Sequence, residues 1–317
     1  MYDEHHGTKA CNHTETPERQ TPWVWVADFE TGKISRRAPK NIASRPGYYA
    51  LPNRPGLPPN VAEESLGKIE SATAPVVAKL RAGDLNLGGQ DWAELHFFMA
   101  FFAVRVPAFR DNIEDFAGRV VTQMAQMMAS QAEYCERTFR EANPDNALAP
   151  EEIEEARRGM LEGRYRIRGT PILSLSVGME SALKTVYPIF SKMKWAILRA
   201  PNGGRFITSD CPVSWFDPTP RPPFYAGHGL GMKKVQVTFP VSPALCLFGG
   251  WLESKRPVIA VDGQTVEAVN WRRVAFADRH AYASTQEGAS FAVEAHRRMT
   301  GKEEGGGQTK PPARATE

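Results

Sequence analysis

The spacing of apolar residues changes from helical to alternating near Trp195. Before this point, segments such as 108–141 carry apolar residues every three to four positions, which is typical of helices packed on one face. After it, segments such as 234–239 alternate around Val235 and Val237, which is typical of strands. Helices in the middle and strands mainly toward the C-terminal side predict an α+β fold.

The strands are expected mainly in the C-terminal part. Segments 195–199 and 205–208 are predicted to pair as a hairpin around Asn202-Gly203-Gly204, followed by strands at 234–239, 244–248 and 282–284. Near the N-terminus, Trp23-Val24-Trp25-Val26, a turn and Lys33-Ile34 predict another hairpin. The predicted architecture is therefore a helical middle region packed with a mainly antiparallel sheet, which the C-terminal strands and the N-terminal hairpin form.

Helices are predicted at 60–81, 90–106, 108–141, from 150 onward, and at 172–193, 264–279 and 289–299. Asn60 is the expected N-cap of the first helix, and Pro75 is expected to kink or split it. Within 108–141 one helix face carries a stripe that we expect to face the core: Phe116, Val120, Met124, Met127, Gln131 and Cys135.

Composition gives the expected domain organisation. The chain has 317 residues, enough to bury a sizeable core. Residues 1–20 and 301–317 are polar or rich in Gly and Pro, which predicts disorder. The remaining residues, 21–300, are expected to form a single α+β domain.

Charge and cysteine content limit the partners and the location. The formal net charge of +3 gives no strong global attraction to nucleic acid or to anionic membranes. The cysteines are scattered, without a C-x-x-C pair, and the histidines show no H-x-x-x-H spacing, so a zinc site is disfavoured. The N-terminus lacks the apolar core of a signal peptide, and the longest apolar run, 97–104, is too short to cross a bilayer. We therefore expect a cytoplasmic protein with no membrane partner.

Two residues after a predicted strand are the first candidates for chemistry. In Thr208-Ser209-Asp210-Cys211-Pro212, the Asp210 carboxylate could bind a metal, accept a proton or orient a donor, and the Ser209 hydroxyl could bind substrate. The same Ser-Asp pair also suits a turn whose side chains bond to main-chain amides. Both interpretations remain open from the sequence.

Further candidates come from the helices. Glu63 and Glu70 are seven residues apart and share one helix face, so with Asp210 they could supply oxygen ligands to Mg²⁺ or Mn²⁺. The alternative is a helix cap at Glu63 and a surface or ion-paired Glu70. Arg105 ends an apolar run and needs acceptors for its guanidinium, either an anionic substrate or an acid such as Glu63, Glu70 or Asp210.

Other polar residues have simpler interpretations. His96 lies beside Phe97-Phe98 and is interpreted as a core histidine. Basic pairs such as Arg272-Arg273 are interpreted as solvated surface, although they could flank a polyanion. The long Pro-rich segment 216–232 could act as a lid over Asp210 or contact a partner.

These residues lead to two function hypotheses. The first is a metal-assisted hydrolase acting on a phosphorylated or nucleic-acid substrate, with Asp210, Glu63 and Glu70 as catalytic acids and metal ligands. Arg105 and Ser209 would bind its substrate. The alternative is a non-catalytic binding or regulatory protein in which the same polar residues form a structural network. Whether the protein is an enzyme is not decided by the sequence.

Several short segments, in order, resemble a bacterial family known as domain of unknown function 4238. They cover about residues 22–285 and include Trp25-Val26-Ala27-Asp28 with Thr31-Gly32, 39–43 leading to Tyr48-Tyr49, Glu63, Glu70, Arg105-Val106-Pro107, Trp195, 206–212 and 239–243. The family's N-terminal His-x-x-Pro-x-x-Tyr-Leu segment is not recognisable here, and Phe102 stands where the family carries Gln. If those groups belong to a site, this copy is altered or inactive. The resemblance implies a shared fold and set of polar residues but no specific reaction.

Overall fold

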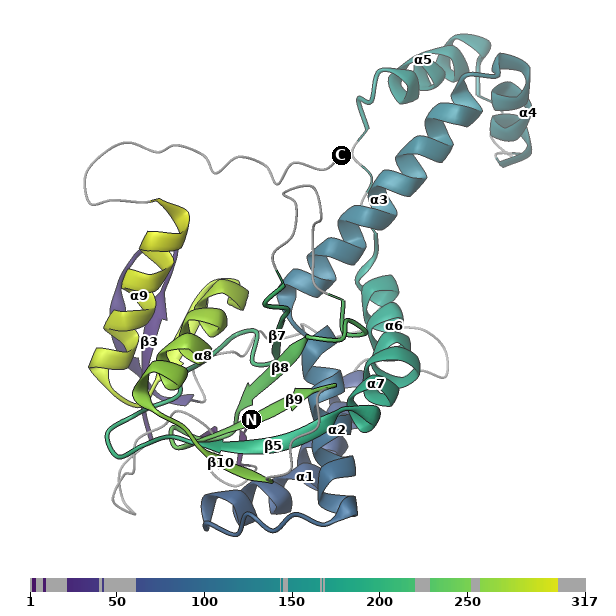
Figure 1. Ribbon diagram of the computed structural model, residues 1–317. Helices are drawn as coiled ribbons and strands as arrows, with labels where there is room; N and C mark the ends of the chain where they lie inside the picture. Colours follow the sequence, from purple (N-terminus) through teal and green to yellow (C-terminus); the bar gives the residue numbers. More distant parts are fainter. Residues whose placement is uncertain are drawn as a thin grey trace. The chain divides into compact units, whose positions relative to one another are not determined.

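A computed structural model describes residues 2–3, 8–9, 22–39, 42, 61–142, 144, 148–165, 167, 169–219, 229–251 and 257–301. It has the predicted α+β class, with two sheets of mostly antiparallel strands and many helices (Figure 1). The predicted disordered ends, 1–20 and 301–317, lie outside these residues except for Gly301 and the short paired strands β1 (Tyr2–Asp3) and β2 (Thr8–Lys9). Most of the predicted lid also lies outside them.

The helices match most of the predicted ranges. They are α1 (Val61–Arg81), α2 (Gly89–Val104), α3 (Pro107–Ala129), α4 (Ala132–Ala142), α5 (Pro150–Leu161), α6 (Pro171–Ser181), the π-helical turn η2 (Ala182–Val186), α7 (Tyr187–Lys192), α8 (Gly263–Phe276) and α9 (Gln286–Thr300). α1 continues through Pro75 as one helix. The predicted helix 108–141 is broken at Ser130-Gln131, and 172–193 contains the π turn just before Pro188, whose ring nitrogen cannot donate a hydrogen bond.

The chain divides into two compact units, each made of separate segments. The first comprises Met1–Pro46, Ile69–Met99 and Ile189–Glu317 and holds both large sheets. The second comprises Gly47–Lys68 and Ala100–Pro188 and is helical in its described part. The expectation of a single domain over 21–300 stays a prediction.

A five-stranded sheet in the first unit follows the order β10-β5-β9-β8-β7. Its strands are β5 (Lys194–Arg199), β7 (Ser214–Phe216), β8 (Gln236–Pro240), β9 (Leu245–Gly250) and β10 (Val258–Ala260). β8 and β9 form an antiparallel hairpin, and β10 lies parallel to β5.

A four-stranded antiparallel sheet follows the order β4-β3-β11-β6. It contains the predicted N-terminal hairpin, β3 (Val24–Asp28) and β4 (Ile34–Arg37), beside β11 (His280–Ala283) and β6 (Thr208–Ser209). The N-terminal hairpin therefore does pair with a C-terminal strand, as the sequence predicted.

The predicted hairpin between 195–199 and 205–208 is wrong. β5 pairs with β9 and β10, whereas β6 pairs with β11 in the other sheet. The intervening backbone is bound elsewhere, because the amides of Ala200 and Phe206 donate to the carbonyls of Ala244 and Pro243. The side-chain oxygen of Asn270, in α8, accepts a hydrogen bond from the amide of the next residue, Ile207.

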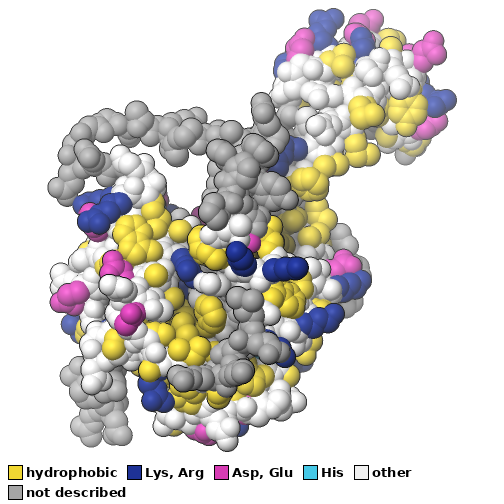
Figure 2. Space-filling view, in the orientation of Figure 1, with side chains coloured by type: hydrophobic (Ala, Val, Ile, Leu, Met, Phe, Trp, Pro, Cys, Tyr) yellow, Lys and Arg dark blue, Asp and Glu magenta, His cyan; other side chains and the backbone are white. Residues whose placement is uncertain are grey.

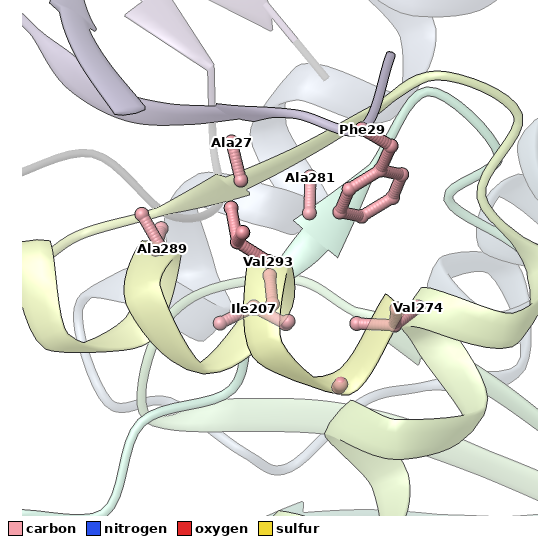
Figure 3. Packing of buried hydrophobic residues seen from close by; sticks show 10 residues of the cluster. Ala27, Phe29, Ile207, Val274, Ala281, Ala289 and Val293 are labelled. Carbon is pink, nitrogen blue, oxygen red and sulfur yellow. The ribbon is translucent and has the colours of Figure 1, made fainter. Parts of the chain in front are cut away.

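One face of the four-stranded sheet packs against α8 and α9 (Figure 3). Small residues of the strands, Ala27 and Ala281, meet Ala289 and Val293 of α9, with Ile207 and Val274 beside them. Small side chains on both sides let the helix approach the sheet closely. The other face carries a second buried apolar cluster, Val24, Val26 and Tyr282 with Ile42, beside the polar residues described below.

The helical unit corrects the predicted core stripe of 108–141. Phe116, Met124 and Met127 are 58%, 63% and 70% exposed, and only Cys135, which lies beyond the helix break, is fully buried. α3 packs on α5 and α6 instead through its opposite side, where Gly118 and Ala129 are buried. We call Phe116, Val120, Met124 and Met127 the α3 stripe.

Among the described residues, no single helix is long and apolar enough to cross a membrane. Only α2 and α3 taken together reach the length and apolar composition of a membrane span, and this pair is bent by 53°.

Candidate functional site

The face of the four-stranded sheet that points away from α9 carries buried apolar residues at its centre, Val24, Val26 and Tyr282, and polar side chains around them. Residues directly opposite each other in an antiparallel pair share a face, and successive residues alternate. Tyr282 lies opposite both Val26 and Thr208, and His280 lies opposite Asp28. The same alternation places Asp210, two residues after Thr208, next to His280 at this end of the sheet.

His280 lies between two carboxylates. Its Nε2 is 3.7 Å from Asp28 Oδ2, and its Nδ1 is 3.8 Å from Asp210 Oδ2. The three side chains are 12–25% exposed, so water reaches them only in part. Each ring nitrogen therefore faces a carboxylate, and the imidazole lies between β3 and the end of β6.

Asp210 is held by the chain segment that leads into β11. Its Oδ1 accepts the amide N–H of Asp278 at 2.9 Å, and its Oδ2 accepts those of Arg279 at 2.7 Å and His280 at 2.8 Å. The Asp210 amide in turn donates to the His280 carbonyl. Asp210 thus ties the end of β6 to the α8–β11 connection, 68 to 70 residues away in sequence.

Asp28 stabilises the turn of the N-terminal hairpin. Its Oδ1 accepts the amides of Glu30 and Thr31, both at 3.0 Å. Burial acts to raise the pKa of Asp28, but the hydrogen bonds from Thr31 and Glu30 and the charge of His280 outweigh it and hold the pKa below its usual value. Asp28 therefore remains ionised at neutral pH and places a negative charge beside the His280 ring.

Ser209 and Cys211 are closed off from solvent. The Ser209 hydroxyl donates to the Cys211 carbonyl at 3.1 Å and accepts from the Cys211 amide at 3.2 Å. Burial raises the pKa of the Cys211 thiol to about 12, helped by the nearby charges of Asp210 and Asp278. Neither side chain is poised to act as a nucleophile in this arrangement.

Two buried hydroxyls lie on the same sheet face as His280. The Oγ atoms of Thr208 and Ser284 have no hydrogen-bond partner in the part of the chain that the structure describes. Their residues are 3% and 6% exposed. Unbonded buried hydroxyls are costly, so these two are polar positions at the border of the apolar cluster of Val24, Val26 and Tyr282.

Arg273, which the sequence pattern indicated as solvated surface, is buried. Arg273 of α8 is fully buried, and it donates to the carbonyls of Cys211 at 2.9 Å and Thr238 at 3.0 Å. It joins the segment after β6 to strand β8, so its role is structural and it is not solvated surface. Its neighbour Arg272 lies over the ring of Phe216 and donates to Gln236. The apolar spacing of α8, in which Val266, Val269 and Val274 share the buried side with Arg273, is the signal that could have indicated it.

The other predicted site residues are distributed over both compact units. Glu63 is exposed in the first turn of α1, and Arg105 lies half-buried after α2, 5.2 Å from the centre of the Phe102 ring; both belong to the helical unit. Glu70, half-buried in α1, belongs to the first unit with Ser209 and Asp210. A shared site of these residues stays a prediction. Within the described ranges, no group of three or more His, Cys, Asp or Glu side chains is placed to hold a metal ion.

His96 is buried, as predicted for a core histidine, but it is not fully satisfied. It is 7% exposed and packs against the rings of both Trp92 and Trp195, with centroid distances of 5.7 and 5.1 Å. Its Nε2 finds no hydrogen-bond partner among the residues with described positions. Burial lowers the pKa of His96 to about 4, so the ring is neutral at physiological pH.

The fold and the site define an α+β protein with two large sheets in one compact unit, a His280 that lies between Asp28 and Asp210, and a second, helical unit. The comparison with protein families agrees with this class: the chain belongs to the family described as protein of unknown function (DUF4238), whose family model matches residues 12–287. The resemblance seen in the sequence is thereby confirmed. No curated protein and no solved structure matched the chain.

Proposed function

We propose that this protein is a non-catalytic binding or regulatory protein in which the polar residues around Asp210 form a structural network. The observation that carries the proposal is the carboxylate of Asp210, whose two oxygens accept three main-chain N–H groups between 2.7 and 2.9 Å. A carboxylate with this many short bonds has little capacity left to bind a metal or attack a substrate.

The test is Asp210→Asn, measured by urea unfolding. Asparagine keeps one oxygen but turns its NH₂ group toward at least one of the N–H donors, so bonds are lost and two donors face each other. We expect a loss of about 2–3 kcal/mol in the free energy of unfolding. Asp111→Asn, at an exposed position of α3, is the matched control and should change little. Wild-type stability of Asp210→Asn would overturn the structural role.

A second candidate function is the metal-assisted hydrolase of a phosphorylated small molecule or nucleic acid. It is favoured by the position of His280, since an imidazole with both nitrogens within 3.8 Å of a carboxylate is suited to proton transfer. Asp210, Glu63 and Glu70 would bind Mg²⁺ or Mn²⁺ and act as catalytic acids, and Arg105 and Ser209 would bind substrate. This function predicts that Mg²⁺ or Mn²⁺ raises the melting temperature and that Asp210→Asn abolishes the rise.

We further propose a location in the bacterial cytoplasm. Supporting this, Cys135, Cys211 and Cys246 are free thiols, each buried, in a chain whose cysteines show no disulfide pattern. Fractionation of cells that produce the full chain tests the location, and recovery in an exported or membrane fraction would contradict it.

A further inference from the structure

We infer that the α3 stripe is the surface through which two copies of this chain associate. The inference rests on the proposed binding role and names its partner as a second copy. The space-filling view shows apolar side chains along the helical unit that carries α3 (Figure 2). Phe116, Met124 and Met127 are 58–70% exposed, and Val120 is 37% exposed. Contiguous exposed apolar side chains of this size usually mark an interaction site.

The stripe lies on a face of α3 that carries no charge. At 3.6 residues per turn, the other residues of 113–127 within about 60° of its centre are Ile113, Ala117 and Gln123. The charged residues of the same stretch, Glu114, Asp115 and Arg119, lie roughly 100° or more from the centre. Two copies can therefore bring this face together without burying a charge or opposing like charges.

The same charge distribution disfavours the other occupants of an apolar helix face. Helices that lie on membranes carry Lys and Arg along their polar side, and nucleic acid needs a basic surface. α3 carries only Arg110 and Arg119 against Asp111, Glu114 and Asp115. Arg110 is moreover paired with Glu114 at 2.8 Å.

The order of side chains along the stripe is complementary to itself when it is reversed. A two-fold axis brings the same patch of both copies together, and an antiparallel crossing near residue 122 places Phe116 opposite Met127 and Val120 opposite Met124. In this arrangement each rigid Phe116 ring contacts a flexible Met127 side chain. Val120, the smallest residue of the stripe, lies near the point where the two helices cross. Each dimer would contain two Phe–Met contacts, which are favourable between sulfur and aromatic rings.

The rest of the helical unit holds α3 firmly from its other side. Arg157 of α5 donates to the Ala129 carbonyl at 3.0 Å, and the Ser174 hydroxyl of α6 bonds to Glu114 at 3.1 Å. Gly169 lies so close to Glu114 that an added Cβ would come within 3.0 Å of its backbone. The stripe is therefore presented by a braced helix, and little ordering is needed on association.

The test is sedimentation of the full chain over a range of concentrations. The wild-type protein should approach twice the 35.2 kDa chain mass as the concentration rises. Met124→Glu should weaken association at least about tenfold, since the dimer would bury two new charges close together. Met124→Leu, which preserves volume and apolarity, should retain it, and so should Arg119→Glu, an exposed position roughly 100° from the centre of the stripe. Because Met124 is 63% exposed, circular dichroism should be unchanged by these substitutions, and so should melting at concentrations low enough for every variant to be monomeric.

The orientation is tested by disulfide cross-linking of cysteine variants. Phe116→Cys mixed with Met127→Cys should form cross-linked dimers, whereas either variant alone should cross-link no more than the unaltered chain, because the Cα atoms must come within about 7 Å. Two results would contradict the inference. A wild-type chain that stays monomeric at all concentrations, or that instead binds phosphatidylcholine vesicles through Met124, would overturn the inference, while the structural role of Asp210 would still be judged by its own unfolding test.

Discussion

The buried His96 makes the stability of the first compact unit depend on pH. In the folded chain its pKa is lowered to about 4 by burial, against an ordinary value of 6.5. Between these two values the unfolded chain binds a proton that the folded chain does not, so stability falls as the pH is lowered through this window. The full difference of 2.5 pH units corresponds to about 3 kcal/mol at 1.36 kcal/mol per unit.

The assay is urea unfolding at pH 7 and pH 5 of the wild type and of His96→Phe. At pH 5 most of the effect is present, and the wild type should lose about 2 kcal/mol through His96 relative to pH 7. Phenylalanine keeps a ring packed against Trp92 and Trp195 but cannot bind a proton. The variant should therefore lose less stability than the wild type over the same change of pH. Equal losses in both proteins would refute the argument, because other groups would then account for the pH dependence.

Further predictions concern packing and the buried guanidinium. Gly249→Ala should destabilise the protein by roughly 1–3 kcal/mol, since a Cβ there would lie 2.8 Å from the Trp195 ring. Gly263→Ala is the control, because a Cβ at that position would have no atom within 4 Å. Equal stability of the two variants would contradict the packing argument. Arg273→Met should cost about 3 kcal/mol in urea unfolding because the carbonyls of Cys211 and Thr238 lose their donors. A change in the free energy of unfolding below about 0.5 kcal/mol is typical of surface positions, and it would support the solvated position that the sequence indicated for Arg273.

The parts of the fold that the sequence predicted are those specified locally. The β3–β4 hairpin follows from aromatic and β-branched residues around the turn that Asp28 caps. The start of α5 follows from Pro150 and from Glu152, whose carboxylate accepts the Ala149 amide at 2.8 Å. In both cases, interactions between residues a few positions apart in the sequence determine the element.

What the sequence did not predict depends on contacts between distant segments. The hairpin of 195–208 has a suitable turn, but its backbone amides are bound by Pro243 and Ala244, which local patterns do not reveal. Asp210 was identified as important, yet its partners lie in the α8–β11 connection, and His280 was missed. Periodicity likewise identified the α3 stripe as one apolar face, but it does not distinguish a face covered within the chain from one left exposed.

The most direct test of the structural role of Asp210 is thermal unfolding of wild type and Asp210→Asn, each with and without Mn²⁺. Our account predicts that the substitution lowers the melting temperature by about 3–5 °C and that Mn²⁺ changes neither protein. An unchanged melting temperature for Asp210→Asn, together with a Mn²⁺-induced rise seen only in the wild type, would contradict it and support metal binding at this carboxylate.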